Sequence, residues 1–145
     1  MDGNKTLHQF NIVTDEIDSL YHKAALKMGL SDSEMLILYE ICDYGETLSQ
    51  SDITGFIGMS KQTVNSAVAN MEKKGWLKRS ERSGRKKVLN LTDEGRKLVD
   101  EIIIPFQEME ESIFDNWTEE ERRLFLDLNF RYRDALKNIL DKLPG

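Results

Sequence analysis

The residues best suited to ligand chemistry in this chain are uncharged amide and hydroxyl side chains in residues 60–75. Gln62, Asn65, Ser66 and Asn70 share one helix face there, with no pattern of opposite charges among them. Asn and Gln can form two hydrogen bonds with an adenine edge in the DNA major groove, and Ser can bond bases or phosphates. The alternative is a solvated helix face that is merely uncharged, and these residues alone do not separate the two interpretations.

The surrounding sequence predicts a helix that presents these side chains. Ser60 is a suitable N-cap, and Gly75 is the residue type that commonly follows a helix end. The apolar residues between them recur at i, i+3, i+4 and i+7, a stripe that packs on a core: Val64, Ala67, Val68 and Met71. The candidate DNA-contacting residues of this helix are Ser60, Lys61, Gln62, Thr63, Asn65, Ser66 and Asn70.

The distribution of charge favours a polyanionic partner. The 145-residue chain has a formal net charge of −6, yet residues 61–97 hold eleven Lys and Arg against four Asp and Glu, a balance of +7. The remaining residues therefore carry −13. A basic module within an acidic chain is typical of a protein that binds nucleic acid through one surface.

Residue types for catalysis are sparse. The two histidines, His8 and His22, are too far apart to share a helix face, and the sequence has no Gly-rich phosphate loop, nucleophile motif or Cys/His cluster with zinc spacing. We therefore expect no enzyme activity, no metal and no cofactor. The single cysteine, Cys42, lies among apolar residues, which favours a buried, inert thiol over a redox sensor.

Two short helices joined by a tight turn are expected to hold the 60–75 segment in place. Residues 31–34 read as a capping box that opens a helix through about residue 43. Residues 48–57 predict a further short helix, which Gly58 ends. This short helix and the 60–75 helix, joined by a tight turn at Gly58 and Met59, form a helix-turn-helix, whose second helix enters the DNA groove.

A basic β-hairpin follows the predicted recognition helix. Residues 76–80 and 87–91 alternate in polarity, and the polar segment between them contains Gly84. A hairpin in this place is the wing of a winged helix, and an ordinary solvated turn does not explain why its charges are nearly all positive. The candidate DNA-contacting residues of the wing are Arg82, Arg85 and Lys86.

Long helices are expected at both ends of the chain. Residues 7–28 have apolar side chains at helical spacing, Thr92 caps a helix in which Pro105 predicts a bend, and residues 118–121 form a capping box for a last helix. Their apolar stripes exceed what one winged helix can cover. Pairing with a second copy of the chain would cover them, and a monomer with a large helical cap is the alternative.

The order of these elements, with four short motifs, resembles the MarR family, the bacterial multiple-antibiotic-resistance-type regulators. The resemblance covers nearly the whole chain. It implies a homodimer whose terminal helices interlock and whose two winged helices read a pseudo-palindromic operator. The motifs are residues 48–53 (Leu-Ser-Gln-Ser-Asp-Ile), 59–64 (Met-Ser-Lys-Gln-Thr-Val), 72–77 (Glu-Lys-Lys-Gly-Trp-Leu) and 91–95 (Leu-Thr-Asp-Glu-Gly).

The resemblance assigns base reading to the recognition helix and a wing contact to Arg85. The family's wing often carries Asp-x-Arg, whereas residues 83–85 here read Ser-Gly-Arg, so the aspartate that would orient the arginine is absent. The wing is also short for the family. Arg85 is then either less firmly held or shares its role with Arg82 and Lys86.

The expected fold class is mainly α with a small β-hairpin wing, in a single domain of residues 1–145. Residues 31–91 would form a winged-helix DNA-binding lobe, and residues 1–30 and 92–145 a helical dimerisation region. The expected function is that of a sequence-specific DNA-binding transcriptional regulator, a repressor, acting as a homodimer. The alternative is a winged-helix protein-interaction module that binds an acidic partner.

The cellular setting follows from the absence of two signals. No apolar run is long enough to span a membrane and the N-terminus lacks a signal-peptide pattern, so we expect a cytoplasmic protein. The resemblance suggests a small-molecule effector site between the dimer helices and the winged helix, although no residue marks its lining.

Overall fold

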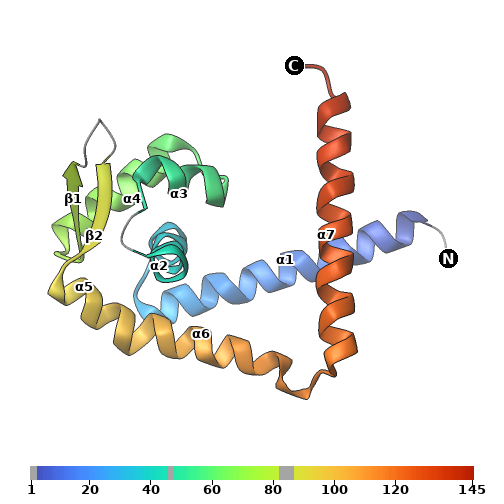
Figure 1. Cartoon of the computed structure of the whole chain (residues 1–145), viewed down its shortest axis with the longest axis horizontal. Coiled ribbons are helices and arrows are strands. Elements are labelled where there is room, and N and C mark those ends of the chain that lie inside the picture. The colour runs from blue at the N-terminus through green and yellow to red at the C-terminus, as the bar shows by residue number, and fades with distance from the viewer. Residues whose placement is uncertain (1–2, 46–47, 82–86) are drawn as a thin grey trace. The chain divides into compact units, whose positions relative to one another are not determined.

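A computed structural model of the protein describes residues 3–45, 48–81 and 87–145, most of which are helical (Figure 1). The chain divides into two compact units, Met1–Pro105 and Phe106–Gly145. The elements in chain order are α1 (Gly3–Met28), α2 (Asp32–Tyr44), α3 (Gln50–Ile57), α4 (Lys61–Lys73), β1 (Leu77–Glu81), β2 (Lys87–Leu91), α5 (Asp93–Leu98), η1 (Val99–Ile103), α6 (Ile104–Glu111), η2 (Ser112–Asn116) and α7 (Glu119–Lys142).

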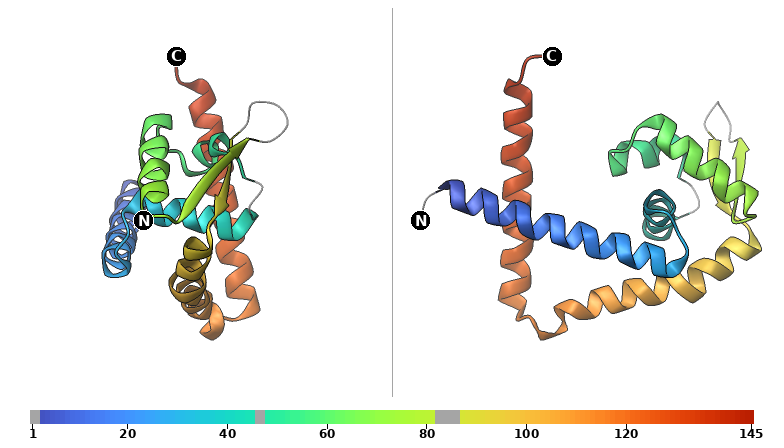
Figure 2. Two further views of the ribbon diagram at one scale, coloured as in Figure 1. Left: turned by 90° about the vertical axis from the view of Figure 1, so that its left-hand side faces the viewer. Right: turned by 180° about the vertical axis from the view of Figure 1, so that it is seen from behind.

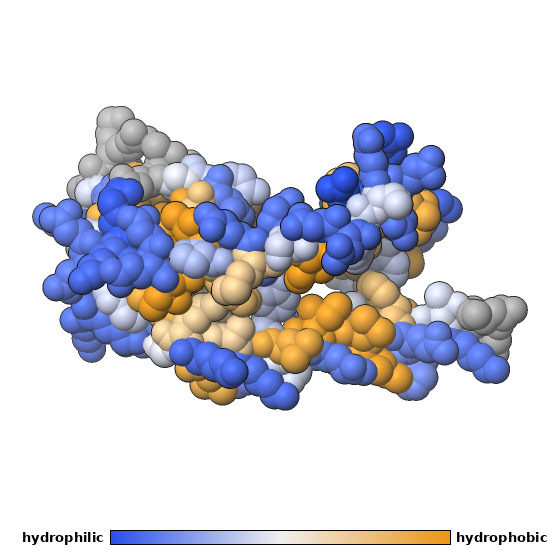
Figure 3. Space-filling model, turned by 90° about the horizontal axis from the view of Figure 1, so that it is seen from below, coloured by the Kyte–Doolittle hydropathy of each residue, from blue (hydrophilic) through white to orange (hydrophobic). Residues whose placement is uncertain are grey.

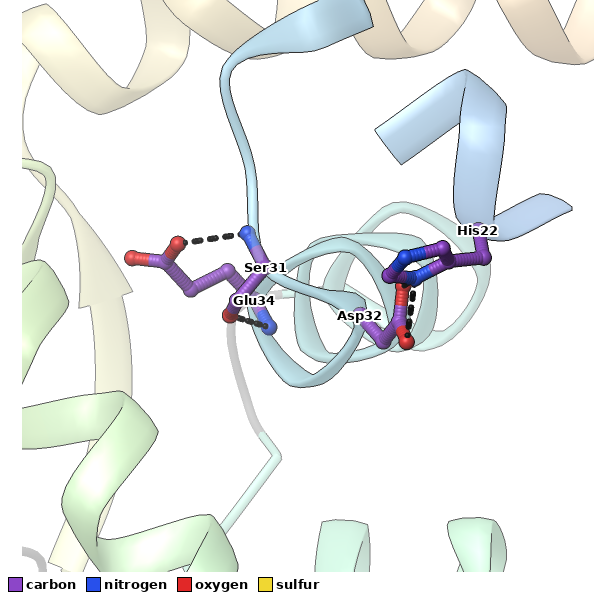
Figure 4. Close-up of polar contacts among 4 residues, drawn as sticks. All are labelled: His22, Ser31, Asp32 and Glu34. Atoms are coloured by element: carbon purple, nitrogen blue, oxygen red, sulfur yellow. Dashed lines mark hydrogen bonds and ion pairs between the residues drawn. The ribbon is translucent and has the colours of Figure 1, made fainter. Parts of the chain in front are cut away.

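The predicted capping box opens α2. The Ser31 hydroxyl accepts from the Glu34 backbone N–H at 3.1 Å, and the Ser31 N–H donates to Glu34 Oε1 at 2.9 Å (Figure 4). Beside this box, His22 Nδ1 of α1 lies 2.9 Å from both carboxylate oxygens of Asp32 (Figure 4). The first turn of α2 is therefore capped by its own residues, and the contact between His22 and Asp32 links it to α1.

The third helix begins two residues later than the sequence predicts. Ser49 is its N-cap, in a second capping box with Asp52, and Leu48 lies outside the helix. The Leu48 carbonyl instead accepts from the Leu89 N–H at 3.1 Å, and Ser49 forms an antiparallel bridge with Val88. Pairing with β2 holds the chain extended at Leu48, so the helix starts only after the bridge.

A glycine turn carries the chain from α4 into the hairpin. Gly75 has φ +81°, a left-handed conformation that favours glycine. The Gly75 N–H donates to the Glu72 carbonyl at 3.0 Å and the Trp76 N–H to the Met71 carbonyl at 2.9 Å, which is a Schellman motif. β1 therefore starts directly beside the end of α4.

The predicted wing is an antiparallel hairpin, and it shares one core with the helices. Leu77 of β1 pairs with Leu91, and Arg79 with Leu89. The hairpin packs against α4 and α3, as two further views show (Figure 2). The buried apolar residues come from α1, α2, α3, α4, both strands, η1 and two connecting segments: Ala25, Leu30, Met35, Ile37, Leu38, Ile41, Leu48, Ile53, Val64, Ala67, Val68, Met71, Leu77, Val88, Leu89, Val99 and Ile103.

The backbone turn that follows α4 also positions α5. The Thr92 N–H donates to the Trp76 carbonyl at 3.0 Å, and the Thr92 hydroxyl donates to the Gly75 carbonyl while capping α5. Gly95 lies so close to this turn that a Cβ there would stand 2.0 Å from the Trp76 carbonyl oxygen. Only glycine fits at this crossing.

The hydrogen bonding of the helix changes just before Pro105, where the sequence predicts a bend. The five residues of η1 adopt π-helical geometry, and the Ile104 N–H donates to the Val99 carbonyl. Proline has no N–H for a regular helical bond, so a wider turn ahead of it accommodates the missing donor.

Both terminal helices carry broad apolar surfaces that the single chain leaves exposed. On α1 the exposed apolar side chains include Leu7, Phe10, Val13, Ile17 and Leu20, and Figure 3 shows an apolar patch along this helix. None of the 24 residues of α7 is buried. In the part of the chain that the structure describes, no helix is long and apolar enough to cross a membrane.

Candidate nucleic-acid interface

The recognition helix α4 buries the stripe that the sequence predicts. Val64, Val68 and Met71 are fully buried and Ala67 is 5% exposed, while the amide and hydroxyl side chains lie at the surface. No acidic residue occurs in α4 before Glu72. The exposed face of α4 is therefore polar, uncharged over most of its length and free of groups that repel phosphate.

One side of this face opens onto a hollow whose described lining residues include three cations. The hollow, of about 510 Å³, lies between α3, α4 and the hairpin. We call it the cationic hollow, and its lining residues are Gln50, Ser51, Thr54, Lys61, Asn65, Arg79 and Lys87. None of its described lining residues is acidic, so its charge and its hydroxyl and amide groups suit an anion such as a DNA phosphate.

Asn65 is fixed at the wall of the cationic hollow. Its Oδ1 accepts from Gln50 Nε2 at 3.2 Å and from Arg79 Nη1 at 3.1 Å. Arg79 is itself held by Glu72, whose Oε1 accepts from Arg79 Nε at 2.8 Å. Side chains of α3, α4 and β1 thus meet at one carboxamide oxygen.

The other side of the α4 face lines a second, shallower hollow of about 360 Å³. Its described lining residues carry no charge and include the start of α2: Ser31, Ser33, Gln62, Thr63, Ser66, Ala67 and Asn70. The predicted base-reading residues are therefore divided: Gln62, Ser66 and Asn70 lie together on this side, and Asn65 lies on the cationic side.

The hydroxyl groups at the start of α4 interact with each other. Ser60 Oγ accepts from the Thr63 N–H at 3.1 Å and lies 2.7 Å from Thr63 Oγ1. Lys61 is exposed beside them and reaches the cationic hollow. This arrangement presents hydroxyl groups and a cation next to free backbone N–H groups of a helix N-terminus, which attract anions.

The predicted wing residues Arg82, Arg85 and Lys86 lie outside the described residues. Lys87 and Arg79, in the described strands of the hairpin, both line the cationic hollow.

Sequence reasoning missed Gln50 and Arg79 as residues of this interface. Strand alternation offered a signal for Arg79, because it lies two residues after the buried Leu77 and so faces the same side of the hairpin. The position of Gln50 beside Asn65 had no local signal, since 15 residues separate the two.

An ion pair anchors the far end of α4 to α2. Lys74 Nζ donates to Glu34 Oε2 at 2.8 Å, and the Glu34 side chain is only 4% exposed. Burial raises the pKa of Glu34, but hydrogen bonds from Lys74 and Ser31 outweigh that effect, so the pKa lies below its usual value. Lys74 also lies 4.7 Å from the centre of the Trp76 ring.

The fold and this surface define the class of winged helix-turn-helix transcriptional regulators. A sequence model of the MarR family matches residues 28–86, which run from the end of α1 to the hairpin. The chain belongs to the MarR family. Among the described residues no group of His, Cys, Asp and Glu could hold a metal ion.

Curated relatives agree with this assignment. The HTH-type transcriptional regulator PecS of Dickeya dadantii is 31% identical over 110 residues, which cover 73% of this chain and 66% of PecS. An uncharacterised HTH-type transcriptional regulator of Bacillus subtilis, YwoH, is 25% identical over 123 residues, which cover 84% of this chain and 89% of YwoH.

Solved structures share the fold over nearly the whole chain. A MarR family regulator from Neisseria meningitidis has a TM-score of 0.80 at 23% identity, covering 99% of this chain and 100% of its own. MepR of S. aureus, in a complex with DNA, has a TM-score of 0.74 at 22% identity, covering 88% of this chain and 94% of its own.

Proposed function

We propose that the protein regulates transcription as a homodimer that binds a pseudo-palindromic DNA operator through α4 and the hairpin. The observation that carries this proposal is the surface of α4, where uncharged amide and hydroxyl groups lie beside the cationic hollow. Such a surface can place bases next to hydrogen-bonding groups and phosphates next to cations. The solved complex of the structural neighbour MepR with DNA supports it.

Each predicted residue takes a part in this scheme. Gln62, Asn65, Ser66 and Asn70 face base edges, while Ser60, Lys61 and Thr63 face the backbone at the N-terminus of α4. The wing residues Arg82, Arg85 and Lys86 contact phosphates or the minor groove. To these we add Arg79 and Lys87, two further described cations that line the cationic hollow with Asn65.

Pairing of two chains supplies the second half of the interface. The apolar surfaces of α1 and α7 are exposed in one chain, and contiguous apolar surface of this extent marks an interaction site. Residues 1–30 and 92–145 therefore serve as the dimerisation region, and residues 31–91 as the DNA-binding lobe. In the cytoplasm the dimer acts as a repressor, and a small-molecule effector releases it from the operator. No structural observation favours the alternative, a module for an acidic protein partner.

Two substitutions test the DNA-binding assignment. The operator is first selected from a randomised duplex library. Asn65→Ala should weaken binding to this operator by about 1–3 kcal/mol, while binding to random DNA stays nearly intact. Arg85→Ala should weaken operator and random DNA alike and flatten the slope of log K against log salt by about 1 per contact, or roughly 2 per dimer. Equal losses on both DNAs for both variants would remove base reading from α4.

The spacing of half-sites tests the dimer on DNA. Two recognition helices related by twofold symmetry require half-site centres about 34–36 Å apart. Inserting about five base pairs at the operator centre should therefore abolish tight binding, because one half-site turns to the far side of the duplex. Inserting about ten base pairs is the control, because it returns both half-sites to the same side of the duplex. Unchanged affinity after the five-base-pair insertion would contradict binding by a twofold dimer.

A further inference from the structure

The hydrogen bonds around Asn65 determine which of its two amide groups is available to DNA. Gln50 Nε2 and Arg79 Nη1 are both N–H donors, and both lie within 3.2 Å of the same Asn65 atom. Only the carbonyl oxygen can accept from two donors, so Oδ1 faces the wall of the cationic hollow. Within the described part of the chain, Asn65 Nδ2 donates to no side chain, so its two hydrogens remain for a ligand.

The anchor that holds this oxygen is firm. Arg79 is paired with Glu72 at 2.8 Å, and its side chain is only 20% exposed. Its backbone lies opposite the fully buried Leu89 in the hairpin register. Gln50 approaches from the first turn of α3, whose start is fixed by the Ser49 capping box. Asn65 cannot rotate its carboxamide without breaking hydrogen bonds to two other elements.

We propose that Arg79 and Gln50 are positioning residues that set the base preference of Asn65. The inference rests on the proposed DNA-binding function and adds to it the class of base that Asn65 reads. Bidentate recognition of adenine needs both the oxygen and the amino group of the amide, because adenine presents an acceptor and a donor. With its oxygen occupied, Asn65 offers only donors, which match the two acceptors of guanine, N7 and O6.

Selection from a randomised duplex DNA library with the full-length protein tests this proposal. The wild type should prefer guanine over adenine at one position in each half-site by about tenfold. Arg79→Met removes the main donor to Oδ1 and keeps an apolar stem, which frees the carboxamide to rotate. Preference at that same position should then move toward adenine, with the other positions unchanged.

Lys87→Met is the matched control, because it removes a cation from the same hollow without a bond to Asn65. It should weaken binding to all sequences and leave the base preference unchanged. Asn65→Asp tests whether the group that faces the base is a donor. One carboxylate oxygen still accepts from Arg79 and Gln50, and the other presents an acceptor to the base in place of the amino group. Preference at the position should change from guanine to cytosine, whose N4 amino group is a donor.

Gln50→Leu keeps the test decisive if Arg79→Met does not fold, since it removes the second donor and leaves the Arg79–Glu72 ion pair in place. Loss of guanine preference in a folded Arg79→Met protein, as judged by thermal unfolding, supports the proposal, and Gln50→Leu takes its place only if Arg79→Met does not fold. Unchanged preference in a folded Arg79→Met protein, or a uniform change at every position, would overturn it. Absence of any DNA binding by the wild type would instead contradict the proposed function.

Discussion

Gly95 occupies a position where backbone meets backbone. A Cβ at this residue would lie 2.0 Å from the Trp76 carbonyl oxygen and 2.9 Å from its carbon, and the Thr92 N–H holds that carbonyl in place. Because neither chain segment is a flexible side chain, Gly95→Ala must displace α5 from the end of α4. We expect a loss of at least about 2 kcal/mol in the free energy of unfolding, measured by urea titration.

Gly55 provides a matched control in α3. A Cβ there meets nothing within 4 Å, so Gly55→Ala should be neutral or stabilise the protein by up to about 1 kcal/mol through helix propensity. Similar losses for the two substitutions would show that the close approach of Trp76 to Gly95 does not limit stability.

At the residue scale we also predict the reactivity of the partly buried Cys42 thiol. Burial raises the pKa of the thiol to about 11, with smaller contributions from the charges of Asp43 and Asp100. The reactive thiolate is therefore scarce at pH 8, and alkylation should be at least about 100-fold slower than for the unfolded chain. A reaction rate equal to that in guanidinium chloride, or release of DNA by peroxide, would show that Cys42 is a sensor.

At the scale of elements, one ion pair joins the start of α2 to the end of α4. Lys74→Met keeps the apolar stem but leaves the buried Glu34 carboxylate without its cation, so the free energy of unfolding at pH 7 should fall by about 1–3 kcal/mol. Arg123→Met is the control, because its pair with Glu119 is exposed and should contribute about 0.5 kcal/mol or less.

The pH dependence of this effect has a defined sign. The folded pKa of Glu34 lies below its usual value of 4.5, so the folded state favours the charged carboxylate. The resulting stability is present above pH 4.5 and is lost as the pH falls through the folded pKa. Urea titrations should show the difference between wild type and Lys74→Met shrinking over that acidic range. A difference that stays constant down to pH 3 would contradict the ion pair as its source.

At the scale of the molecule, the exposed apolar surfaces of α1 and α7 test the proposed homodimer. On α7, Leu128, Tyr132, Leu136 and Leu140 recur every four residues and are 47–65% exposed. The protein should sediment as a dimer at micromolar concentration. Leu136→Glu places a charge in this stripe and should shift the equilibrium toward monomer, whereas Lys137→Glu, at the adjacent polar position, should not.

A chain truncated before Ser31 extends this test. It loses α1 and should be poorly soluble, because the apolar surface that α1 would cover in the proposed dimer becomes exposed. A soluble, monomeric truncated protein that unfolds cooperatively would count against interlocked terminal helices, as would a wild-type monomer at micromolar concentration.

The sequence by itself determined the features that depend on residues a few positions apart. The capping boxes at Ser31 and Thr118, the glycine end of α4 at Gly75 and the buried stripe from Val64 to Met71 are all as predicted. Each rests on hydrogen bonds or side-chain spacing within one or two helical turns, so the local pattern is sufficient. The hairpin after α4 follows in the same way from alternation.

The tertiary structure decided whatever depends on distant segments of the chain. Leu48 is extended because β2 bonds to it across 41 residues, which no local pattern reveals. The polar face of α4 is divided between two hollows because the start of α2 lies on one side and the hairpin on the other. Asn65 presents only its amino group because α3 and β1 meet at its oxygen, and the approach of those two elements is a consequence of core packing that helical and strand periodicity cannot specify.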